Sequence, residues 1–290
     1  MDLYAYHFDL RAKPLEAGVR LEERLAYLER ITADPLQTNP VHVIQLGLGT
    51  LQLRDPEQLP LIAAVVRWLE QSADDDGLLA YRFPMPHTFS LDPPWYSSLA
   101  QGEAGSLLVR AAELLGRSEL CELADRVIEP LLQLESPLVV VTPEGPVLEE
   151  YPTDPPSQVL NGWITSLFGL YDIARAPRAA AAERAAAAFE ASVQTLATRL
   201  HLYRLALGWS RYDLYPHPLT NAASPSYQRL HVAQLRELHS LTNRELFATT
   251  ANEWERSLAN PAARLIGLGR KVVFRLVRPR WRRESGRCSR

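Results

Sequence analysis

The chain has 290 residues, 47% of them hydrophobic and 22% charged, which is typical of a globular protein and excludes a disordered or fibrous one. The net charge of −3 is divided unevenly, because residues 268–290 carry a net +8 and the residues before them −11. No apolar stretch reaches the roughly 20 residues of a membrane-spanning helix. The opening residues carry charges where a signal peptide is apolar, and Cys121 and Cys288 lie far apart. We therefore expect a cytoplasmic protein.

Apolar residues recur at helical spacing in seven long segments, each bounded by Pro, Gly or Asp. Short turns join consecutive segments, which predicts helical hairpins. The expected helices are residues 60–71, 94–115, 119–134, 157–174, 177–200, 226–241 and 243–258.

Two segments depart from this helical pattern. Residues 137–141 and 146–151 are short β-type runs separated by a Pro/Gly turn, which predicts a hairpin. Residues 77–94 form a long loop rich in Tyr, Phe and Pro, and such loops are typically functional when they are ordered. The pattern predicts an all-α fold with small β-hairpin insertions, in which helical hairpins form a toroid with a concave groove. We expect one domain over residues 1–260 and a basic amphipathic tail over residues 261–290.

Polar and aromatic side chains concentrate in residues 148–173 and 208–241. The predicted strand of the first segment ends in Glu149, Glu150 and Tyr151. Alternation along a strand places Glu149 and Tyr151 on one face and Glu150 on the other. The second segment contains Tyr212, Tyr215 and His217, followed by Tyr227 and His231 at positions four apart on one helical face.

Six motifs occur in a fixed order over residues 39–241. They are NPVHVIQLGLG, WYSSLAQGEAGSLLVRA, EEYPTDPPSQVLNGW, GLYD, YDL, and a Tyr four residues before a His that is followed by Gln-Leu. In this series the chain resembles the carboxy-terminal domain of the D-glucuronyl carbon-5 epimerases, which convert D-glucuronate to L-iduronate inside a heparosan-type chain. The resemblance implies an incomplete α/α barrel.

The resemblance also implies four catalytic residues: Glu150, Tyr151, Tyr212 and Tyr227. Epimerisation removes a proton alpha to a carboxylate and returns one to the opposite face, so it needs two groups on opposite sides of the sugar. We expect Tyr151 and Tyr212 to be these facing groups, with Glu150 assisting and Tyr227 orienting the substrate or sharing the proton transfer. Neither a metal nor a cofactor is expected.

The charge that develops on the uronate carboxylate requires hydrogen-bond donors. In the family an Arg-His pair follows YDL, whereas Tyr215-Pro216-His217 follows it here, so Arg211 or Arg229 would have to replace that arginine. Because the body is acidic and the substrate anionic, we expect Arg82, Arg211 and Arg229 to make the groove locally basic. The candidate substrate-binding residues are Arg82, Trp95, Gln101, Asn161, Arg211, Tyr215, His217, Arg229 and His231.

Two other functions remain open. The same carbanion can expel the group on carbon 4, which would make the protein a uronate lyase. The arginine missing after YDL also allows a carbohydrate-binding or assembly protein without turnover. The expected partner in each case is an anionic uronate-containing glycan.

The tail at residues 262–281 alternates apolar and basic residues. This pattern predicts a peripheral contact with an anionic membrane, or with a membrane-bound polysaccharide synthase. Nucleic acid is not an expected partner, because the basic charge is confined to the tail of an acidic chain. A homodimer remains open.

Overall fold

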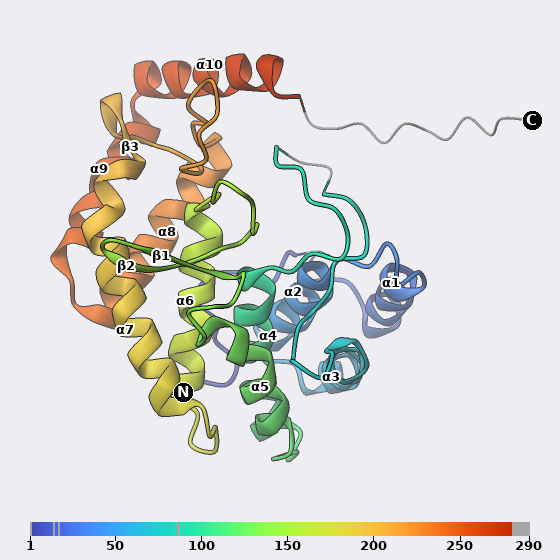
Figure 1. Ribbon diagram of the computed structural model, residues 1–290. Helices are drawn as coiled ribbons and strands as arrows, with labels where there is room; N and C mark the ends of the chain where they lie inside the picture. The colour runs from blue at the N-terminus through green and yellow to red at the C-terminus, as the bar shows by residue number, and fades with distance from the viewer. Residues whose placement is uncertain (1, 14, 17, 86–87, 280–290) are drawn as a thin grey trace, which may run out of the picture.

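The computed structural model describes residues 2–13, 15–16, 18–85 and 88–279, and within these it contains ten α-helices and two small antiparallel sheets (Figure 1). The predicted all-α class with β-hairpin insertions is confirmed. The helices are α1 (Leu21–Thr32), α2 (Pro40–Leu51), α3 (Leu59–Ser72), α4 (Ser98–Leu114), α5 (Leu120–Ile128), α6 (Leu160–Ala174), α7 (Ala182–Arg199), α8 (Pro225–Thr242), α9 (Glu245–Ala259) and α10 (Pro261–Val277). The strands β1 (Val139–Thr142) and β2 (Gly145–Leu148) form one sheet, and β3 (Arg204–Leu205) and β4 (Trp209–Ser210) form the other.

The helices pack in the order of the chain. The even-numbered helices α2, α4, α6 and α8 contact one another in succession. α3 and α5 each pack against both neighbouring even-numbered helices, α7 packs against α6, and α9 packs against α8 and α10. This is the arrangement of consecutive helical hairpins, in agreement with the short turns in the sequence. The closure of these helices into a toroid stays a prediction.

The observed elements differ from the predictions in several places. α4 begins at Ser98, because Trp95 lies in extended chain and pairs with Tyr81 in an isolated β-bridge. β2 ends at Leu148, so Glu149 to Tyr151 lie beyond the strand. α1 and α2 were not among the expected helices, and α2 contains two glycines and four β-branched residues, all of which lower helix propensity. Burial of most of its side chains compensates for that propensity.

The contact between α4 and α6 is unusually close. A Cβ atom on Gly169 would lie 2.3 Å from the Cα atom of Gly102, so neither position has room for a side chain. The Ser166 hydroxyl, in the middle of α6, donates a hydrogen bond of 2.8 Å to Ser98 at the start of α4. Towards their far ends, buried Arg110 and Asp172 form a salt bridge of 2.6 Å. These contacts fix both the separation and the register of the two helices.

Helix α10 lies across one end of the other helices (Figure 1). Its inner face buries Phe274 against His217. Lys271 Nζ donates to Asn221 Oδ1 at 2.7 Å, and an Arg275 guanidinium nitrogen donates to Thr88 Oγ1 at 2.8 Å. The predicted tail therefore begins as a docked helix, and residues 280–290 lie outside the described residues. None of the described helices is both long and apolar enough to cross a membrane.

The close contact of α4 with α6 predicts that Gly169→Ala lowers the free energy of unfolding by about 3 kcal/mol, because the added methyl group meets backbone. Gly105→Ala is the matched control on α4, since its Cβ would meet only side-chain atoms at 3.5 Å. Thermal unfolding followed by circular dichroism measures both variants. Equal midpoints for the two would contradict this account of the helix contact.

Candidate active site

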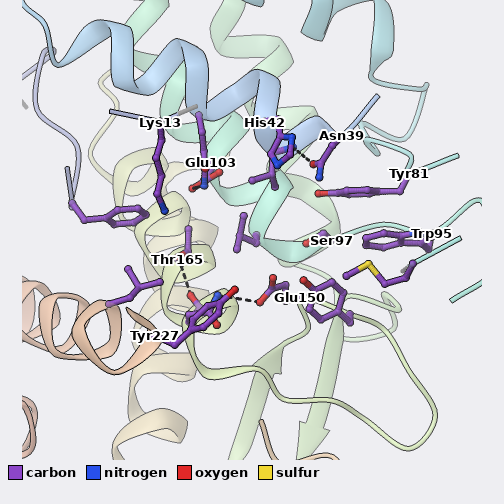
Figure 2. Close-up of a pocket in the computed structure, with 18 of the residues that line it drawn as sticks. Lys13, Asn39, His42, Tyr81, Trp95, Ser97, Glu103, Glu150, Thr165 and Tyr227 are labelled. Atoms are coloured by element: carbon purple, nitrogen blue, oxygen red, sulfur yellow. Dashed lines mark hydrogen bonds between the residues drawn. The ribbon is translucent and has the colours of Figure 1, made fainter. Parts of the chain in front are cut away.

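A cavity of about 530 Å³ opens where the first turns of α2, α4, α6 and α8 meet (Figure 2). The positive ends of these helix dipoles point towards one region, which favours an anionic ligand. The helices contribute Gln45, Glu103, Asn161 and Tyr227, among other lining residues. The connecting segments and the N-terminal segment contribute Lys13, Tyr81, Trp95, Ser97, Glu150 and Tyr151.

Glu150 is the central acid of this cavity. It is 7% exposed, and burial raises the pKa of its carboxyl to about 7. The Tyr151 hydroxyl donates a hydrogen bond to it, and Asn161 Nδ2 donates a second one at 3.3 Å. A Cβ atom at Gly162 would lie 2.3 Å from Glu150 Oε2, so glycine at this position allows α6 to approach the carboxyl group.

The neighbouring Glu149 is not among the residues that line the cavity, and it instead accepts hydrogen bonds from the segment before α6. Its carboxylate accepts hydrogen bonds from the Ser157 hydroxyl at 2.6 Å and from the backbone N–H groups of Ser157 and Gln158. Glu150 and Tyr151 both line the cavity, so the alternation that separated them is wrong. The reason is that the strand ends at Leu148, before either residue.

Tyr227 lines the cavity and Tyr212 lies behind it. Their rings meet edge to face with centroids 4.8 Å apart, and their side chains interact by hydrogen bonding. Tyr212 is only 1% exposed, and burial raises its pKa well above the ordinary value. Burial raises the pKa of Tyr151 in the same way. Both hydroxyls are therefore neutral at pH 7 and act as donors.

Backbone hydrogen bonds connect the two polar segments to the helix starts. The first N–H of α4, at Ser98, donates to the carbonyl of Glu149 at 3.1 Å. The first N–H of α6, at Leu160, donates to the carbonyl of Tyr212 at 3.0 Å. These bonds satisfy N–H groups that a helix leaves unpaired at its start. They also bring segments about 50 residues apart to one cavity.

Of the predicted binding residues, Trp95 and Asn161 line the cavity. Trp95 stacks on Tyr81 with ring centroids 3.8 Å apart, and its indole N–H donates to the carbonyl of Phe83 at 2.9 Å. Gln101 points elsewhere: its amide nitrogen donates to the carbonyls of Gly77 and Val127 inside the protein. Gln101 therefore supports the loop before the cavity and does not line the cavity itself.

The three predicted arginines are not among the residues that line this cavity. Arg82 lines a separate cavity beside α3, with Trp68 and Gln71. Arg229 is exposed on α8, and Arg211 pairs through its backbone with Ala222. The structure therefore does not place Arg82, Arg211 or Arg229 where the expected basic groove would need them.

The remaining candidates are not among the residues that line the cavity. Tyr215 and His217 pack on Phe89, with ring centroids 5.4 and 5.8 Å away, and His217 Nε2 lies 3.3 Å from an Asp213 carboxylate oxygen. His231 is buried, and its Nδ1 lies 2.8 Å from the Ser210 hydroxyl. Burial lowers the pKa of His231 to about 3, so its ring stays neutral.

Several lining residues were not predicted from the sequence, and Glu103 is the most informative of them. It is fully buried, and burial raises the pKa of its carboxyl to about 8. Gln45 Nε2 donates to Glu103 Oε1 at 3.0 Å. A carboxyl group inside the small and apolar run AQGEAGSLL was a signal that could have indicated it. Lys13, His42, Gln45 and Tyr81 also line the cavity.

No metal-binding cluster is present in the part of the chain that the structure describes, where no three His, Cys, Asp or Glu side chains are placed to hold an ion.

Comparison with known proteins identifies the family of this chain. The sequence model of the family described as D-glucuronyl C5-epimerase C-terminus matches residues 74–256. The chain belongs to this family.

A curated relative, the D-glucuronyl C5-epimerase of Caenorhabditis elegans, is 30% identical over 211 residues. The aligned region covers 66% of this chain and 34% of the relative. The chain therefore spans about a third of the length of the protein it matches.

The buried acids predict how stability depends on pH. Glu103 keeps its proton up to about pH 8 in the folded protein, whereas an unfolded glutamate releases it near 4.3. The folded state therefore binds more protons between about pH 5 and 8, and the free energy of unfolding falls as pH rises, by at most about 1.4 kcal/mol per pH unit for one group. Denaturant unfolding across this range should show a shallower fall for Glu103→Gln. Glu113→Gln, at an exposed site of the same helix, should keep the wild-type slope, and an unchanged slope in Glu103→Gln would contradict the assignment.

Proposed function

We propose that this protein is a uronate carbon-5 epimerase, which converts D-glucuronate to L-iduronate within a heparosan-like glycan. The observation that carries the proposal is the cavity that combines Glu150, with a pKa near 7, with the side chains of Tyr151 and Tyr227. A general base works best when its pKa lies near the operating pH. Membership of the family supports the same reaction.

Glu150 is the proposed base. Burial raises the pKa values of Tyr151 and Tyr212, so these tyrosines keep their protons at neutral pH, whereas the carboxyl of Glu150, with a pKa of about 7, can release its proton there. Its carboxylate removes the proton on carbon 5, and the bonding electrons move into the substrate carboxylate to form an enediolate. The hydrogen bonds from Tyr151 and Asn161 hold Glu150 in position.

Tyr227 is the proposed acid on the other face of the sugar. Its neutral hydroxyl gives a proton to carbon 5, the electron pair of the enediolate forms the new C–H bond, and the configuration is inverted. Tyr212 contacts Tyr227 from behind, and its hydrogen bond stabilises the Tyr227 phenolate until solvent returns a proton to Tyr227 and takes up the proton that Glu150 removed. Tyr212 therefore acts through Tyr227 in this proposal. The reverse reaction uses the two faces in exchanged roles.

Tyr151→Phe should lower deuterium incorporation at carbon 5 by about tenfold or more when the protein acts on a heparosan-type chain in deuterated water, because the variant loses one of the two hydrogen bonds that hold Glu150. Nuclear magnetic resonance of the product measures the incorporation. Tyr171→Phe is the control, since it removes a hydroxyl from α6 at a position that does not line the cavity. Full exchange in Tyr151→Phe would contradict the assignment.

The same incubation separates the other two functions. Exchange without chain cleavage indicates an epimerase. A carbon-4 leaving group expelled from the enediolate gives an unsaturated uronate, which absorbs ultraviolet light and indicates a lyase. Binding of the chain without exchange or cleavage indicates a carbohydrate-binding protein.

We also propose that the outer face of α10 contacts an anionic membrane. Leu265 and Leu276 are 72% and 79% exposed, although leucine is normally buried. Exposed Arg264, Arg270 and Arg278 lie on the same helix or at its end. An apolar surface flanked by arginines is complementary to acyl chains beneath anionic headgroups.

The double variant Leu265→Glu with Leu276→Glu should reduce sedimentation of the protein with phosphatidylserine-containing vesicles by about tenfold. Both sites are exposed, so the change leaves the core intact. Leu36→Glu with Leu246→Glu replaces exposed leucines on other elements and serves as the control. Equal sedimentation of the two double variants would remove the membrane proposal.

A further inference from the structure

Lys13 reaches the cavity because the N-terminal segment is anchored to α2. The side chain of Gln52, just after α2, accepts a hydrogen bond from the Leu10 N–H at 2.7 Å and donates one to the Phe8 carbonyl at 2.9 Å. Leu10 is fully buried, and the Lys13 N–H donates to its carbonyl at 2.8 Å. These hydrogen bonds therefore fix the backbone of this segment from Phe8 to Lys13. Lys13 extends from it to the cavity.

Glu103 lies beside Lys13 on one wall of the cavity, across from Glu150 and Tyr227 (Figure 2). The positive charge of Lys13 lowers the pKa of Glu103, although burial raises it more, so the two side chains interact. Gln45 occupies only Oε1 of Glu103. Oε2 is buried and has no hydrogen-bond partner, although it is in a cavity-lining side chain. A buried polar atom without a partner indicates a ligand position.

We propose that Lys13 and Glu103 form the subsite that holds the carboxylate of the uronate, with Lys13 supplying the charge and Glu103 Oε2 donating a hydrogen bond. Among the described residues that line the cavity, Lys13 is the one Lys or Arg. The inference rests on the proposed function, because it takes a uronate as the ligand.

The geometry fits the chemistry of carbon 5. The C–H bond and the bond to the carboxylate diverge from the same carbon, so the group that holds the carboxylate must lie away from the base. Lys13 and Glu103 are across the cavity from Glu150 (Figure 2). Protonated Glu103 does not repel an anion, and its proton can strengthen a hydrogen bond as charge builds on the carboxylate oxygens.

This subsite includes a residue outside the family match. Lys13 precedes residues 74–256, which the family model covers, and it replaces the cation that none of Arg82, Arg211 and Arg229 supplies at the cavity. Recognition of the carboxylate by the N-terminal segment would thus be a feature of this chain.

The test compares binding of a heparosan-type tetrasaccharide with binding of its carboxyl-reduced form, in which glucose replaces each glucuronate. Isothermal titration calorimetry gives the ratio of the two dissociation constants. Lys13→Met should lower the wild-type preference for the carboxylate form about tenfold or more, since a hydrogen bond to a charged group is lost. Lys13→Arg should retain most of the preference. Arg11→Met is the matched control, because Arg11 is exposed in the same segment and pairs with Asp9.

Glu103 is tested in the same assay. Glu103→Gln keeps a neutral donor and should retain the preference, whereas Glu103→Leu should lower it about tenfold. A wild-type protein that binds both sugars equally, or a Lys13→Met variant with the wild-type ratio, would overturn the subsite.

Deuterium exchange at carbon 5 separates this outcome from the proposed function. Exchange by the wild type together with an unchanged ratio in Lys13→Met refutes the subsite alone. A ratio that depends on Lys13 without any exchange supports the subsite and refutes the epimerase.

Discussion

The close approach of α4 and α6 is the constraint on which the cavity depends. Gly102 and Gly169 let the two backbones touch, and Ser98, Ser166, Arg110 and Asp172 fix the register of the helices along their length. Glu103 directly follows Gly102, so the contact that brings the helices together also sets the depth of this acid. Asn161 and Gly162 begin α6 and position Glu150 from the other side. A buried salt bridge adds little net stability, but as a specific pairing it excludes helix registers that a purely apolar contact would allow.

Much of the fold follows from the sequence, because amphipathic helices repeat their pattern locally. The periodicity identified seven helices and the β1–β2 hairpin, and the boundaries shifted where an extended residue, such as Trp95, preceded a helix. α2 was harder to predict. Its two glycines and β-branched residues lower helix propensity, and burial between neighbouring helices stabilises it through contacts that a local pattern does not contain.

Part of the site was also predictable from local sequence motifs. Glu150, Tyr151 and Tyr227 belong to motifs with unusual composition, and the structure brings them to one cavity. Lys13 belongs to no motif. It reaches the cavity because Leu10 is hydrogen-bonded to Gln52, which lies about 40 residues further along the chain. The alternation that placed Glu150 away from Tyr151 failed because it assumed a strand that had already ended. Local sequence patterns indicate candidate residues, but contacts between residues far apart in the chain determine which side chains lie in the same cavity.

The charge of the chain shows why location matters more than the total. The residues before 268 carry a net −11, which would repel an anionic glycan, and two of the acids lie in the proposed binding cavity. Burial raises the pKa of Glu103 to about 8, so that this group is neutral at pH 7, and Glu150 is poised near pH 7. Four helix starts and Lys13 add positive potential at the same place. Because burial keeps Glu103 protonated, its carboxyl group can donate a hydrogen bond to an incoming carboxylate. An acidic protein can thus present an anion-binding cavity without a cluster of arginines.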